Sequence, residues 1–97
     1  MTLAPRYRAS ERALLTELGD GTGVLLDLDS KFYFTLNETA IFVWKQLADR
    51  DALDREQLAT RVALAFEVDT AQAGSDLDAV LELLARERLV TVSAAAR

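Results

Sequence analysis

The residues of this chain that could do chemistry are mostly carboxylates, because its 97 residues include no histidine and no cysteine. That composition removes thiol nucleophiles, imidazole acid–base catalysis and most transition-metal ligand sets. Asp27 and Asp29 are spaced so that they could hold a hard cation or act as a phosphotransferase pair. We interpret residues 27–30 as a turn instead, since Asp next to Ser before a strand is ordinary turn chemistry and such a magnesium site needs a larger parallel α/β domain.

Two other groups of residues have a chemical and a structural interpretation. The glycines at 19, 21 and 23 suggest a phosphate-binding loop, but such a loop opens a helix, whereas these glycines precede a strand. The third predicted helix also contains several carboxylates, and a solvated helix face explains them better than an acid–base pair without a pocket. These carboxylates are Asp76, Asp78, Glu82 and Glu87. The sequence therefore predicts no catalytic residue, no metal site and no cofactor, and the chain is not expected to be an enzyme.

The elements that would position a binding site are three strands followed by three helices. Residues 13–18 form a short, largely apolar run, residues 24–28 alternate well enough to place Val24, Leu26 and Leu28 on one face, and residues 32–36 form a third run; glycine or Asp-Ser turns separate them. This pattern predicts a three-stranded antiparallel meander. Residues 89–92 could add a short extended piece, and residues 93–97 are expected to be a frayed tail.

The apolar period changes to about 3.6 after Asn37, which is a suitable helix N-cap. Ile41, Trp44, Leu47 and Ala48 then form a stripe that can cover the sheet, with Trp44 at its centre. A second helix is expected to run from a capping box at residues 54–57 to about residue 66, and a third, capped by Asp69, to span roughly residues 70–88. The fold class predicted is α+β.

The last strand and the last helix are more apolar than a free-standing core requires. Phe32, Tyr33 and Phe34 place apolar bulk on both faces of one strand, and that strand has an unpaired edge unless residues 89–92 close it. In the alternative interpretation Phe32 and Phe34 are core and Tyr33 is half exposed. Leu83 widens the third helix beyond its core stripe of Leu77, Val80, Leu81 and Leu84. An open strand edge beside an apolar helix is the geometry of β-augmentation, in which a peptide adds to the sheet.

The segments 24–30 and 33–37, followed by Trp44 and Leu47, resemble the pyrroloquinoline-quinone biosynthesis protein D (PqqD) family, the founding set of RiPP recognition elements. The resemblance continues through residues 66–69 and 76–89 and covers about residues 5–92. It implies a winged-helix-like domain of three strands and three helices. It also implies that the leader of a precursor peptide binds as a fourth strand against the last strand, beside the third helix.

The resemblance also supplies candidate peptide-binding positions. On the strand these are Lys31, Phe32, Tyr33, Phe34, Thr35 and Leu36, and on the third helix they are Asp76, Val80, Leu83 and Glu87. Lys31-Phe32 replaces a Gly-Arg pair that is frequent in relatives, so Phe32 could change the leader preference.

We therefore expect residues 1–97 to form one noncatalytic, cytoplasmic domain that presents a precursor peptide to a RiPP-modifying enzyme, such as a leader peptidase or a radical SAM enzyme. No signal peptide or membrane span is visible. The net charge of -5 disfavours nucleic acid and anionic membranes as partners. Two alternatives remain: a winged-helix DNA-binding regulator, which the acidic third helix disfavours, and a structural subunit that forms a homodimer through the last strand.

Overall fold

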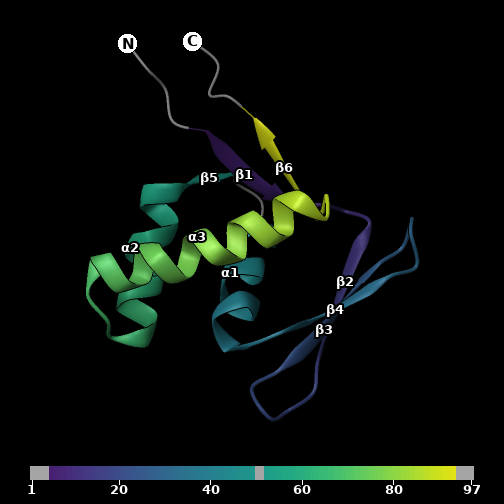
Figure 1. The fold of residues 1–97 in the computed structure, drawn as a ribbon, viewed down its shortest axis with the longest axis horizontal. Coiled ribbons are helices and arrows are strands. Elements are labelled where there is room, and N and C mark those ends of the chain that lie inside the picture. Colours follow the sequence, from purple (N-terminus) through teal and green to yellow (C-terminus); the bar gives the residue numbers. More distant parts are fainter. Residues whose placement is uncertain (1–4, 50–51, 94–97) are drawn as a thin grey trace.

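A helical body and a projecting three-stranded sheet make up the fold in the computed structural model, which describes residues 5–49 and 52–93 (Figure 1). The elements in chain order are β1 (Arg6–Ala9), β2 (Ala13–Glu17), β3 (Gly23–Asp27), β4 (Tyr33–Leu36), α1 (Glu38–Ala48), β5 (Leu53–Asp54), α2 (Arg55–Phe66), α3 (Thr70–Arg86) and β6 (Val90–Ser93). The predicted α+β, winged-helix-like class is confirmed.

The predicted meander is present as the antiparallel sheet β2-β3-β4. Gly19 and Gly21, in the loop between β2 and β3, have φ values of +85° and +89°, which glycine adopts without a steric penalty. In the next turn the Asp27 carboxylate accepts hydrogen bonds from the Asp29 N–H and the Ser30 hydroxyl, at 3.0 and 3.1 Å. The interpretation of residues 27–30 as a turn is therefore confirmed.

A second sheet, β5-β1-β6, was not predicted. Residues 6–9 alternate arginine with Tyr7 and Ala9, and their partner β6 lies more than 80 residues away, so no local pattern marks the pairing. The predicted extended piece at residues 89–92 is found one residue further on as β6, so Ser93 is a strand residue and was wrongly assigned to the frayed tail, whose other residues lie outside the described part of the chain. Val90 of this strand pairs with Ala9 of β1. The C-terminal strand therefore does not close the edge of the meander.

The three helices begin at the predicted caps. Side-chain oxygens of Asn37, Asp54 and Asp69 accept the backbone N–H three residues further on, at 2.9, 2.8 and 2.7 Å. Such caps satisfy donors that have no partner within the helix. α2 ends at Phe66 as expected, whereas α3 ends at Arg86, two residues before the predicted end.

The core lies where α1 packs against α2, α3 and β1, and α1 meets the meander at β4. Trp44 is 4% exposed and Leu47 is fully buried, as the predicted stripe requires. Ala48 was wrongly included in that stripe, because it is the last residue of α1 and is exposed.

A bidentate ion pair joins α2 to α3. The Arg55 guanidinium donates to the two carboxylate oxygens of Asp78 at 2.6 and 2.9 Å. These hydrogen bonds lower the pKa of Asp78 and raise the pKa of Arg55. A Cβ atom on Gly74 would lie 2.8 Å from the Arg55 Nη2 atom, so glycine permits this close approach. Among the described residues, no helix is long and apolar enough to cross a membrane.

Candidate functional site

Among residues 5–49 and 52–93, no strand pairs with the outer edge of β4, because β4 is the last strand of its sheet and β6 pairs with β1. The Asp27 N–H donates to the Phe32 carbonyl at 2.9 Å, and Phe34 lies opposite Leu25 two residues further along. Hydrogen-bonded pairs alternate along an antiparallel ladder, so Phe32 and Phe34 direct their backbone groups toward β3. The N–H and C=O groups of Tyr33 and Thr35 consequently point outward, to the open edge.

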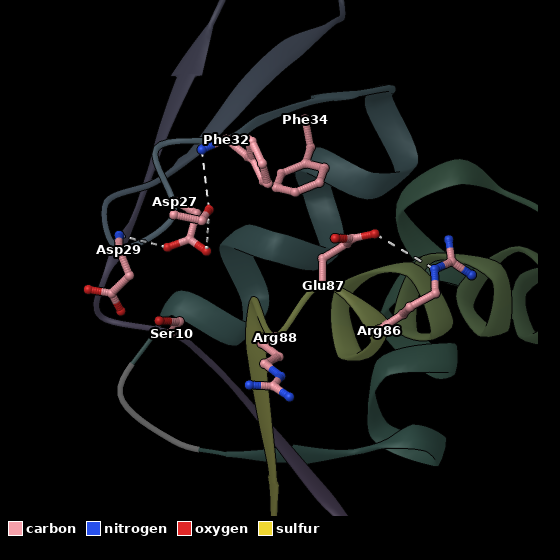
Figure 2. Close-up of a pocket in the computed structure, with 9 residues that line it drawn as sticks. Ser10, Asp27, Asp29, Phe32, Phe34, Arg86, Glu87 and Arg88 are labelled. Carbon is pink, nitrogen blue, oxygen red and sulfur yellow. Dashed lines mark hydrogen bonds and ion pairs between the residues drawn. The ribbon is translucent and has the colours of Figure 1, made fainter.

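A hollow of about 550 Å³ lies beside the start of β4, where the strand faces the C-terminal end of α3 (Figure 2). Figure 2 shows the rings of Phe32 and Phe34 next to each other, facing Glu87. Phe32 is 67% exposed, and Phe34 is half-buried. The alternative that placed Phe32 in the core is therefore wrong: β4 begins only at Tyr33, and the ring of Phe32 forms a wall of the hollow.

A second hollow, of about 300 Å³, lies at the other end of β4. It is lined by Asn37, Thr39, Asp76, Ala79 and Val80. Phe32 and Phe34, at the start of β4, share a hollow with the C-terminal end of α3, and Asn37, directly after β4, shares one with the earlier α3 residues Asp76 and Val80. The strand and the helix therefore run in opposite directions. We call these two hollows together the β4–α3 groove; the predicted residues among its lining are Phe32, Phe34, Asp76, Val80 and Glu87.

The structure brings most of the predicted peptide-binding residues to this groove or its edge. Phe32, Phe34, Asp76, Val80 and Glu87 line the two hollows. Leu83 is half-buried and lines neither hollow, but the helical repeat places it on α3 between Val80 and Glu87.

The remaining predicted positions lie around β4. Tyr33 and Thr35 are exposed at the open edge, with side chains on the face opposite Phe34. Lys31 is exposed in the preceding turn with a φ of 68°. Leu36 is only 1% exposed, so its side chain belongs to the core.

Several residues that line the hollows were not predicted from the sequence. They are Ser10, Asp27, Asp29, Ser30, Asn37, Thr39, Ala79, Arg86 and Arg88. The helical repeat could have suggested Ala79, which lies one turn from Asp76 and Leu83. Ser10 follows a strand that was itself missed, and no local pattern indicates its position.

Charges of both signs surround the aromatic part of the groove. Asp29 pairs with Arg12 at 2.8 Å, and Glu87 with Arg86 at 3.8 Å. Arg88 has a left-handed φ of 59° and, among the described residues, no ion-pair partner. No group of three or more carboxylates in the described part of the chain could hold a metal ion. The arrangement is thus suited to binding an extended chain, with apolar contacts inside and charged groups at the rim.

The fold and this groove define the class as a small winged-helix-like α+β domain with an open strand edge beside a helix. The profile of the family described as "Coenzyme PQQ synthesis protein D (PqqD)" matches residues 22–90, and the chain belongs to this family. No curated protein matches the sequence.

Two solved structures share the fold, each with 25% sequence identity and a TM-score of 0.68. One is "TbiB1 in Complex with the TbiA(beta) Leader Peptide", and the match covers 86% of this chain and 93% of that one. The other is "Lasso peptide synthetase B1 complexed with the leader peptide", with 88% and 96% covered. Both are similar proteins in which a leader peptide is bound.

Proposed function

We propose that this chain binds the leader of a ribosomally synthesised precursor peptide as a fourth strand on β4 and presents the precursor to a modifying enzyme. Membership of the PqqD family supports this role, as do the two similar proteins described with bound leader peptides. The domain itself is noncatalytic in this proposal, and the chemistry belongs to the enzyme.

The proposal depends on one observation: the backbone groups of Tyr33 and Thr35, next to the β4–α3 groove, pair with no strand in the described part of the chain. An extended peptide can form hydrogen bonds with these backbone groups. Leader residues opposite Tyr33 and Thr35 then project to the same side as those two side chains. The leader residue opposite Phe34 projects into the groove, where side chains of α3 can contact it.

A proline scan of the leader tests this geometry. The probe is a fluorescently labelled synthetic peptide with the leader sequence encoded beside this chain, and fluorescence anisotropy measures its affinity. Proline lacks an N–H group, so it should weaken binding about three- to tenfold wherever that N–H points toward β4. At the intervening positions the N–H points away from β4, and proline should cost much less.

The expected result is a loss of affinity at every second residue across a window of about five residues, the length of a typical strand. A loss that repeats every three or four residues would indicate a bound helix and contradict the proposal. Uniform tolerance of proline would also contradict it, because backbone pairing would then contribute nothing.

The proposal takes residues 1–97 as one cytoplasmic domain whose peptide contacts are the strand positions 31–36 and the α3 positions Asp76, Val80, Leu83 and Glu87.

A DNA-binding role is disfavoured, since α3 has more carboxylates than basic residues, whereas binding to DNA phosphates requires an excess of basic residues.

A further inference from the structure

The meander has an uncharged, partly apolar face that points away from the helices, and this feature is separate from the β4–α3 groove. Two rows of cross-strand neighbours form it. We call it the outer face, and its residues are Leu14, Leu26 and Tyr33 in one row and Thr16, Val24 and Thr35 in the other.

The burial pattern establishes which side of the sheet faces the core. Leu25 and Leu36 are 0% and 1% exposed, and residues on a strand alternate between faces, so the outer-face residues point to the opposite side. Leu14 and Tyr33, at the two ends of their row, are 54% and 71% exposed. The ends of this row are therefore open to solvent.

The composition of the outer face is unusual for a solvated sheet surface. None of its six residues is charged, although charged residues make up 28% of the whole sequence. An antiparallel sheet with one face in water normally alternates apolar and polar residues so that the exposed face is polar. Here Leu25 and Leu26, which are consecutive, supply apolar side chains to both faces, so both faces are suited to burial.

We infer that the outer face is the docking surface for the modifying enzyme to which the leader is presented, an inference that rests on the proposed function. The first argument is continuity. A leader strand added to β4 extends the same sheet, and the leader residues opposite Tyr33 and Thr35 project onto the outer face. A protein bound there contacts the domain and the leader together, as presentation of the precursor requires.

Area and charge favour an enzyme over a second copy of this chain. Two strands of five residues and one of four span at most about 17 by 14 Å, or roughly 250 Å² in plan. A stable complex buries about 800 Å² on each partner, so the outer face needs a larger interface around it, which the leader strand and its enzyme provide. Two copies would each have a net charge of -5 and repel, whereas a partner with an apolar centre and a basic rim would be attracted.

The test uses Leu14→Glu and Thr16→Glu, which place a charge on the outer face at exposed positions of β2, far from the open edge of β4. Leu64→Glu is the matched control, because Leu64 is a 76% exposed leucine on α2. Surface plasmon resonance measures binding to the immobilised modifying enzyme from the same gene cluster, with saturating leader peptide. Anisotropy measures leader affinity, and thermal melts verify folding.

We expect both outer-face variants to bind the enzyme at least tenfold more weakly, with leader affinity within twofold of wild type and no effect of Leu64→Glu. Equal enzyme binding by all variants would overturn the inference, as would an equal loss in Leu64→Glu. A concentration-dependent dimer that Leu14→Glu dissociates would identify the outer face as a self-interface, which also overturns it. Failure of the wild-type protein to bind leader would instead reject the proposed function.

Discussion

Replacing Phe32 with alanine should separate leader binding from folding. Phe32 is 67% exposed and lines the larger hollow of the β4–α3 groove. An aromatic side chain has roughly 200 Å² of surface, so about 130 Å² remains for a bound leader to cover. At about 25 cal/mol per Å², complete coverage contributes about 3 kcal/mol. Allowing for the area that alanine retains, Phe32→Ala should cost about 2 kcal/mol, or about thirtyfold in Kd.

Two positions of similar exposure provide controls, one next to Phe32 in the chain and one on α2. Tyr33 is 71% exposed, but its side chain lies on the opposite face, where it can form only cross-strand contacts with the leader. Tyr33→Ala should therefore cost less than about 1 kcal/mol, or at most about fivefold. Leu64→Ala, at a 76% exposed site on α2, should leave the affinity unchanged.

The assay is fluorescence anisotropy with the labelled leader, accompanied by thermal melts of each variant. Equal losses of affinity for Phe32→Ala and Tyr33→Ala would mean that the exposure of the side chain determines its contribution to binding, whether or not it lies in the groove. An unchanged Kd for Phe32→Ala, with normal binding by the wild type, would refute the assignment of the larger hollow to the leader.

Three further perturbations follow from the structure. Leu83→Asp should cost about 3 kcal/mol of leader binding, more than a hundredfold, because the bound peptide would desolvate the new charge; an intact thermal melt with normal affinity would remove Leu83 from the site. Trp44→Ala should destabilise the fold by about 3–5 kcal/mol and abolish the helical circular dichroism signal, and a variant that melts like wild type would show that Trp44 does not hold α1 in the core. The hydrogen bonds from Arg55 lower the pKa of Asp78 in the folded state below its value in the unfolded state. The pair therefore contributes its full stabilisation above the unfolded-state pKa of aspartate, and this stabilisation is lost as the pH falls through the folded-state pKa. Melts should therefore show Asp78→Asn as less stable than wild type at pH 7, by a small margin for so exposed a pair, and as equally stable in strong acid; a difference that persists in acid would contradict the assigned cause.

Local signals in the sequence determined most of the elements that support the site. Asn37, Asp54 and Asp69 specify helix starts because a side-chain oxygen three residues before a free backbone N–H can cap it without help from the rest of the fold. The meander was predictable for a similar reason, since alternation and short turns connect strands that are neighbours in the chain. The surplus of apolar residues at 32–34 also predicts that this strand meets something beyond the core, and this stays a prediction.

Only the tertiary structure decided how these elements meet. The pairing of β1 with β6 joins residues more than 80 positions apart, and it is this pairing that leaves the β4 edge open. Whether Phe32 or Phe34 is the more buried depends on where β4 begins, which the preceding turn sets through the Asp27 carboxylate. The outer face emerged from the register of β2, β3 and β4, because only cross-strand pairing places Leu14 beside Leu26 and Tyr33. A periodic pattern gives the faces of one strand, whereas a binding surface depends on several strands packed together.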